Sequence, residues 1–172
     1  MRNQNVAVFD LTGRVALITG GGSGIGRGCA NILAEAGAAV VIVGRRIDKL
    51  KSVQEEIMKK NGKCAIFAAD LTNEEACKET VAFCVEQFGR LDIVVNSAGG
   101  RGVHGELEKE FLTENLNHTM SVDFNSAFFV IKYAYPECAK QGVGSIINIA
   151  SLHRWQHYRQ EVRLYTRQQK VP

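Results

Sequence analysis

A glycine-rich stretch near the start of the chain has the composition of a phosphate-binding loop. It is Thr19-Gly20-Gly21-Gly22-Ser23-Gly24-Ile25-Gly26, and it lies between an apolar run and a helical pattern. Glycines let the backbone turn sharply and approach a phosphate without a Cβ in the way. The free N–H groups and the dipole at the start of the following helix then favour negative charge. With a strand before it and a helix after it, the stretch indicates a dinucleotide diphosphate site more than a simple tight turn.

The elements that must position this loop follow from the hydrophobic pattern. Apolar runs, rich in β-branched and aliphatic residues, alternate with stretches of helical period. The predicted strands are 15–18, 39–43, 64–69, 91–95 and 145–150, and the predicted helices are 24–36, 48–60, 72–88 and 120–140. Such strands, separated by helices, predict an α/β fold: a doubly wound parallel sheet of the Rossmann type, covered on both faces.

Two local signals refine the helices. Thr72 is followed by Glu75 three residues on, the spacing of a capping box, so we expect Thr72 to cap the third helix. Pro136 predicts a kink or a new start within the fourth helix.

The motifs along residues 8–151 resemble those of the short-chain dehydrogenase/reductase family. Residues 19–26 match the family's Thr-Gly-x-x-x-Gly-x-Gly at every fixed position, and 96–99 (Asn-Ser-Ala-Gly) are similar to its Asn-Asn-Ala-Gly. Asp70-Leu71 follows the third strand, where the family contacts the adenine ring. Asn96 would brace the sheet centre, and the backbone after it would line the cofactor ribose. The resemblance implies these cofactor-binding residues: Thr19, Gly20, Ser23, Gly24, Ile25, Gly26, Asp70, Leu71, Asn96, Ala98 and Gly99.

The end of the second strand bears on the choice between NAD and NADP. Gly44 is followed by Arg45 and Arg46, and no carboxylate occurs before Asp48. An enzyme that prefers NAD usually carries an acid here for the ribose 2′-hydroxyl. A guanidinium suits a 2′-phosphate, with which it can pair in a bidentate manner, so we expect NADP(H) to be favoured over NAD(H). The plain alternative is a pair of exposed loop arginines.

The resemblance further implies hydride transfer between the nicotinamide and a small carbonyl or secondary alcohol substrate. Ser151, at the end of the fifth strand, matches the catalytic serine. Asp123 stands where the family has an asparagine, in Val-Asp-Phe-Asn, and is a catalytic candidate with an altered role. Asn125 is two residues away, about 200° around an α-helix, and should point elsewhere.

The catalytic Tyr and Lys of the family are four residues apart on one helix face. Here Tyr165 and Lys170 form the only available pair, and they are five residues apart, with Gln169 at the fourth position. Residues 152–172 also lack Gly and Ala and have a net charge of +4, so we divide the chain into a dinucleotide-binding domain, 1–151, and an atypical basic tail, 152–172.

Three interpretations of the tail stay open. It could be a non-native end such as a frameshift or alternative exon, an amphipathic basic helix for a membrane or partner, or a shifted catalytic pair. A truncated, non-catalytic isoform that binds only nucleotide or a partner subunit is therefore the alternative function. By resemblance the sequence lacks the family's C-terminal strands, which would leave the fifth strand as an open edge.

Composition narrows the remaining classes. The chain has 172 residues, 45% hydrophobic and 23% charged, which is typical of one soluble globular domain. Without the tail the net charge is −1, so the body gives no electrostatic reason to expect nucleic acid or a membrane. The five scattered cysteines have no metal-ligand spacing, so we expect reduced thiols, no metal and a cytoplasmic location. The family resemblance implies a homo-oligomer in its full-length form.

Overall fold

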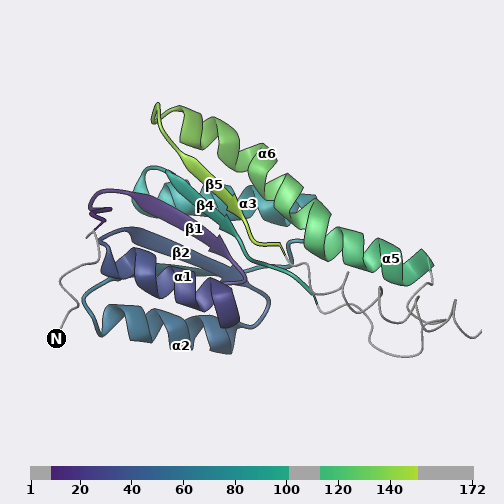
Figure 1. The fold of residues 1–172 in the computed structure, drawn as a ribbon, viewed down its shortest axis with the longest axis horizontal. Helices are drawn as coiled ribbons and strands as arrows, with labels where there is room; N and C mark the ends of the chain where they lie inside the picture. The colour runs from purple at the N-terminus through teal and green to yellow at the C-terminus, as the bar shows by residue number, and fades with distance from the viewer. Residues whose placement is uncertain (1–8, 101–112, 151–172) are drawn as a thin grey trace, which may run out of the picture.

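The computed structural model describes residues 9–100 and 113–150. They form a five-stranded parallel sheet in the order β3-β2-β1-β4-β5 (Figure 1). The strands are β1 (Val15–Thr19), β2 (Ala39–Gly44), β3 (Lys63–Ala68), β4 (Ile93–Asn96) and β5 (Ser145–Asn148). The chain runs outward from β1 to β3 and then returns to the other side of β1, so β1 and β4 flank the switch point at which ligands bind in such sheets.

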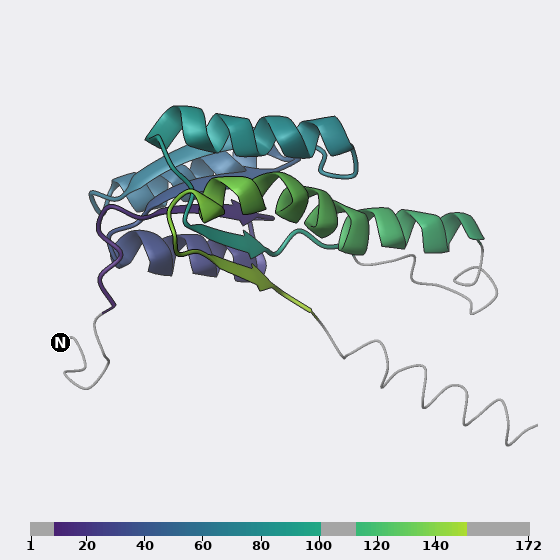
Figure 2. The ribbon, with the colours of Figure 1, turned by 90° about the horizontal axis from the view of Figure 1, so that it is seen from above.

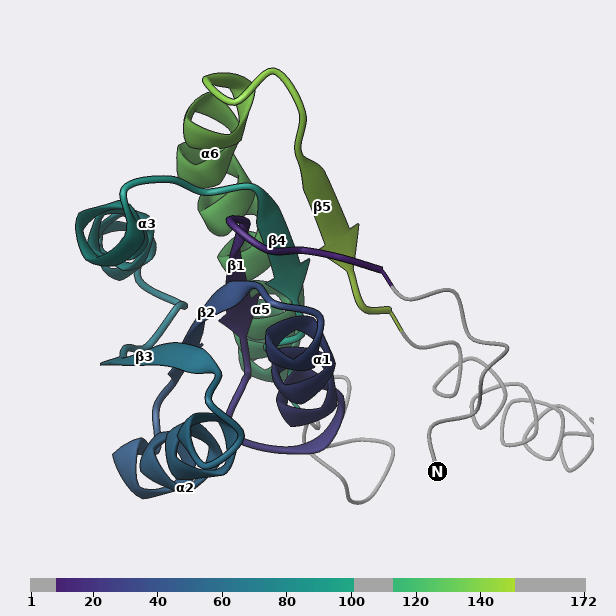
Figure 3. The ribbon, with the colours of Figure 1, turned by 90° about the vertical axis from the view of Figure 1, so that its left-hand side faces the viewer.

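Helices cover both faces of the sheet (Figure 3). α1 (Gly24–Glu35) and α2 (Ile47–Met58) lie on one face, and α3 (Glu74–Phe88) and α6 (Ser126–Ala139) lie on the other. Along β1, Ala16 and Ile18 pack under the first pair of helices, whereas Leu17 packs under the second. Because both faces are buried, the central strands are continuously apolar, which confirms the predicted α/β fold.

The last helical region is a long rod that differs from the prediction. It begins with α5 (Thr113–Met120), passes through a wider π-helical turn, η1 (Ser121–Asn125), and continues as α6. α5 projects beyond the carboxyl edge of the sheet (Figures 1 and 2). No new helix starts at Pro136, because α6 contains Pro136, and the π-helical change in geometry occurs earlier, at η1.

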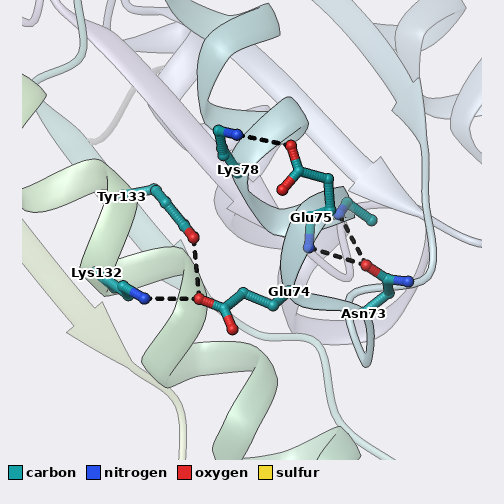
Figure 4. A network of polar contacts seen from close by, with 7 residues as sticks. Asn73, Glu74, Glu75, Lys78, Lys132 and Tyr133 are labelled. Atoms are coloured by element: carbon teal, nitrogen blue, oxygen red, sulfur yellow. Dashed lines mark hydrogen bonds and ion pairs between the residues drawn. The ribbon is translucent and has the colours of Figure 1, made fainter.

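The predicted cap of α3 is also wrong. Asn73 is the cap, and its Oδ1 accepts hydrogen bonds from the backbone N–H groups of Glu75 at 2.9 Å and Ala76 at 3.3 Å (Figure 4). Thr72 is already engaged, because its N–H and its hydroxyl both donate to Asp70 Oδ1, at 3.1 and 2.9 Å. Because Asp70 engages Thr72, the helix is capped one residue later than predicted.

Asp92 joins the strands at the amino edge, opposite the glycine loop. Its carboxylate accepts a bidentate pair of hydrogen bonds from Arg90 at 2.8 and 2.6 Å, one from Arg14 at 2.9 Å and one from Val15 N–H at 3.0 Å. Burial raises the pKa of Asp92, but these hydrogen bonds outweigh it and hold the pKa below its ordinary value. The network secures the start of β1 beside β4.

Candidate dinucleotide site

The glycine loop links β1 to α1 and lies against the segment that follows β4. Gly20 and Gly24 have φ of +67° and +53°, which favours glycine at both positions. A Cβ on Gly20 would lie 2.7 Å from the carbonyl oxygen of Ser97. The hydroxyl of Thr19 accepts hydrogen bonds from Ser97 N–H at 3.1 Å and Ala98 N–H at 3.0 Å. Thr19 and Gly20 thus bring the two predicted motifs into direct contact.

The start of α1 has the properties of an anion site. Ser23 is the N-cap, but its side chain makes no capping hydrogen bond, and the first turn contains no acidic residue. Neither the cap residue nor the first turn of α1 therefore compensates the positive end of the helix, which is a favourable place for a diphosphate. Gly26 is buried against the loop, whereas Ile25 is 61% exposed beside it.

The arginines after β2 are exposed, and Arg46 adjoins this loop. Arg46 Nη2 lies 3.4 Å from Ser23 Oγ, a long hydrogen bond that places the guanidinium beside the glycine loop. Arg45 precedes it and contributes to the electrostatics of Asp70 at the end of β3. The guanidinium groups leave positive charge near the position where an NAD-type site would have a carboxylate.

The segment after β3 presents Asp70 but not the side chain of Leu71. Asp70 is exposed, and hydrogen bonds from the backbone and side chain of Thr72 hold its pKa below the ordinary value, with smaller effects from Arg45 and His118. Leu71 is only 6% exposed and packs in the core, so only its backbone can face a ligand.

This segment is also fixed from the side of the rod. Glu74 Oε1, at the start of α3, accepts hydrogen bonds from Lys132 Nζ at 2.7 Å and from Tyr133 Oη at 2.9 Å, both on α6 (Figure 4). These hydrogen bonds hold the pKa of Glu74 below its ordinary value. Together with the Asn73 cap, they hold the start of α3 against α6.

Asn96 braces the sheet as the resemblance implied. It is 4% exposed at the end of β4, and its Nδ2 donates to Asn148 Oδ1 on β5 at 2.9 Å. Its own Oδ1 has no hydrogen-bond partner among the described residues. Sequence reasoning missed Asn148, although a lone polar residue in the apolar run Ile146-Ile147-Asn148-Ile149 was an available signal.

Asp123, the predicted replacement for a catalytic asparagine, contacts the loop after β4. It is exposed on η1, and its Oδ1 accepts a hydrogen bond from Gly100 N–H at 2.7 Å. The other catalytic candidates, Ser151, Tyr165 and Lys170, lie outside the described residues.

The cysteines behave as structural thiols. All five are free, and three of them, Cys77, Cys84 and Cys138, are buried. Burial raises the pKa of Cys84 to about 12 and that of Cys77 to about 11, so neither is a thiolate near neutral pH. Within residues 9–100 and 113–150, no group of His, Cys, Asp and Glu side chains could hold a metal ion.

The described part of the site therefore collects a glycine loop, two arginines, Asp70 and the Asn96–Gly99 segment at the carboxyl edge of one parallel sheet. This is the arrangement of a dinucleotide-binding Rossmann domain. A search of protein families matches residues 14–166 to the short chain dehydrogenase family. The chain belongs to this family.

Individual relatives support this family membership. The chain is 38% identical, over 149 residues, to a 2-dehydro-3-deoxy-D-gluconate 5-dehydrogenase of Bacillus subtilis, covering 86% of this chain and 57% of that protein. A crystallised 7α-hydroxysteroid dehydrogenase with NADH and 7-oxo glycochenodeoxycholic acid has a TM-score of 0.78 and 31% identity, covering 84% of this chain and 55% of that one. A metagenomic short-chain oxidoreductase with NADP has a TM-score of 0.77 and 31% identity, covering 83% and 64%. The chain thus spans little more than half the length of such relatives.

None of the described helices combines the length and the apolar character needed to cross a bilayer.

Proposed function

We propose that the chain binds NADP(H) in preference to NAD(H) and serves hydride transfer to or from a small carbonyl or secondary alcohol. Bound NADP(H) would supply or accept the hydride at its nicotinamide ring. The observation that carries this proposal is the contact between the two motifs, because Thr19 Oγ1 holds Ser97 and Ala98 against the glycine loop. The two neighbours that contain NADH and NADP make both cofactors chemically reasonable for this fold.

The preference for NADP(H) rests on Arg45 and Arg46. Both are exposed, and Arg46 reaches Ser23 on the glycine loop. A 2′-phosphate would replace that long contact with a charge-assisted pair.

The test is fluorescence titration of NADPH and NADH against the wild-type chain and Arg46→Ala. We expect the variant to lose about tenfold or more in affinity for NADPH and to bind NADH unchanged, because only NADPH carries the phosphate. Arg27→Ala is the control: it removes the same charge from exposed Arg27 of α1, which pairs with Glu56. Equal losses for the two cofactors would contradict the proposed preference.

For catalysis, we propose Ser151 as the hydrogen-bond partner of the substrate oxygen and Tyr165 with Lys170 as the proton-transfer pair. Turnover of a panel of ketones, followed by the absorbance of the reduced nicotinamide and abolished by Tyr165→Phe, would support this assignment. The alternative is a nucleotide-binding chain without turnover, and the five-residue step from Tyr165 to Lys170 favours it. NADPH binding without turnover of any ketone would establish that alternative.

We also propose a homo-oligomer formed through the rod. Four large apolar side chains, each four residues after the last, are exposed along it: Leu116 at 58%, Met120 at 43%, Phe124 at 58% and Phe128 at 54%. The rings of the two phenylalanines stack with centroids 6.5 Å apart. Such a stripe can pair with its own copy about a two-fold axis.

Phe128→Ser should then reduce the mass in light scattering, whereas Val143→Ser, which removes an apolar side chain 60% exposed outside the rod, should not. A wild-type monomer would refute the oligomer.

We also propose a cytoplasmic location, because five free thiols are consistent with a reducing compartment.

A further inference from the structure

The hydrogen bond between Asp123 and Gly100 closes the loop after β4 onto the rod. At 2.7 Å from Oδ1 to N, it is shorter than most neutral amide hydrogen bonds and has the length of a charge-assisted one. Gly100 is the fourth residue after β4, and Asp123 lies on η1. Among the described residues, no strand pairing joins these two segments, so the bond is a direct link between them.

The wide turn presents Asp123 to the loop, and Ser126 stabilises that turn. The N–H of Ser126 donates to Ser121 O, five residues back, so Val122 O loses the partner it would have in an α-helix. The hydroxyl of Ser126 donates to Val122 O instead, at 2.6 Å. Ser126 is only 4% exposed, so this substitute hydrogen bond is shielded from water.

Two glycines lie where this loop contacts the turn, and a side chain at Gly100 would crowd Val122. A Cβ on Gly100 would lie 3.3 Å from Val122 Cγ1, and a Cβ on Gly99 would lie 3.5 Å from Asp123 Oδ1. The start of the same loop is held by Thr19 Oγ1, which accepts from Ser97 and Ala98. Residues 97–100 are thus fixed at both ends, at the glycine loop and at the rod.

We propose that Asp123 is a positioning residue rather than a proton carrier. Its carboxylate fixes the end of the 97–100 segment, so that the backbone of Ala98 and Gly99 keeps its place along the path of the dinucleotide. This inference rests on the proposed cofactor site. A carboxylate suits the task because either of its oxygens can accept a hydrogen bond, whereas an asparagine side chain must present its oxygen and not its amide nitrogen.

The experiment compares Asp123→Ala and Asp123→Asn with Glu114→Ala, which removes the same charge from exposed Glu114 on the same rod. Hydrogen exchange of the Gly100 amide is followed by NMR on the full chain without cofactor, and NADPH affinity by titration. In Asp123→Ala we expect Gly100 exchange to accelerate about tenfold or more and NADPH affinity to fall about threefold to tenfold. Asp123→Asn should restore both largely, and Glu114→Ala should change neither.

The proposal is overturned if Gly100 exchange stays at the wild-type rate in Asp123→Ala, or if Glu114→Ala has the same effect. If the alanine variant does not fold, Asp123→Asn still decides the question: replacing the charge-assisted bond with a neutral one should shift the Gly100 amide resonance upfield, and an unshifted resonance would overturn the proposal. A wild-type chain that binds no cofactor would refute the proposed function. Gly100 exchange would still report on the Asp123–Gly100 hydrogen bond, so failure of the proposed function and failure of this inference are distinguishable.

Discussion

The close packing of Gly26 against the glycine loop gives a sharp prediction. A Cβ on Gly26 would overlap the carbonyl oxygen of Gly20 and lie 2.7 Å from its carbonyl carbon, so the loop would have to move. Both obstructing atoms belong to the backbone and cannot rotate away. We expect Gly26→Ala to lower the free energy of unfolding by about 1–3 kcal/mol, the usual cost of overpacking. The displaced loop should also lose about tenfold or more in NADPH affinity.

Gly28→Ala is the matched control, because it makes the same substitution two residues later in α1. A Cβ there would meet nothing within 4 Å, so the added methyl should only improve helix propensity, by about 0.5–1 kcal/mol. Urea denaturation followed by far-ultraviolet circular dichroism gives the stabilities, and NADPH fluorescence gives the affinities. If Gly26→Ala is as stable as Gly28→Ala and binds NADPH like the wild type, the inference that Gly26 lets α1 approach the loop is refuted.

Two further predictions concern stability. Asp92→Ala should lower the free energy of unfolding by about 2–4 kcal/mol, because it leaves Val15 N–H without its acceptor. The loss should be smaller than for a fully buried ion pair, because Arg14 and Arg90, at 40% and 34% side-chain exposure, can be hydrated instead. Against the effect of burial, hydrogen bonds hold the pKa of Asp92 in the folded chain below its ordinary value, so its contribution to stability should be complete above about pH 4 and lost as the pH falls through the folded pKa. Acid denaturation of wild type and Asp92→Asn checks this, and parallel pH profiles would contradict it. Asn73→Ala should cost about 1 kcal/mol in urea denaturation, and Thr72→Ala should cost less, because Asn73 and not Thr72 caps α3; the reverse order would be inconsistent with this cap.

Most of the fold was predictable because its signals are local. Continuous apolar strands, glycine at the ends of α1 and α3, and alternating helical periods specify a parallel sheet without any knowledge of tertiary contacts. The cap of α3 and the course of the rod were not predicted correctly, because both depend on which neighbouring groups form hydrogen bonds with each other. Thr72 satisfied the capping-box spacing, but Asp70 takes its hydroxyl, and nothing in the spacing shows which acceptor prevails. The rod differs because the π-helical turn depends on a buried serine hydroxyl that compensates for a lost backbone partner.

The same distinction applies to the site. The glycine loop, Asp70 and the Asn96–Gly99 segment could be placed at one edge because parallel strands bring their carboxyl ends together. The Asn96–Asn148 pair required the register of β4 against β5, which aligns these two residues directly. The hydrogen bond from Gly100 to Asp123 could be found only once η1 was known. The expected rotation of about 200° between Asp123 and Asn125 assumed an α-helix, whereas residues 121–125 form a π-helical turn. What distinguishes the two groups is that a strand end can be located from its own residues, whereas a side-chain pair depends on how two distant segments are aligned. The altered residue at position 123 was therefore visible in the sequence, but its partner, a backbone N–H, could be found only in the folded chain.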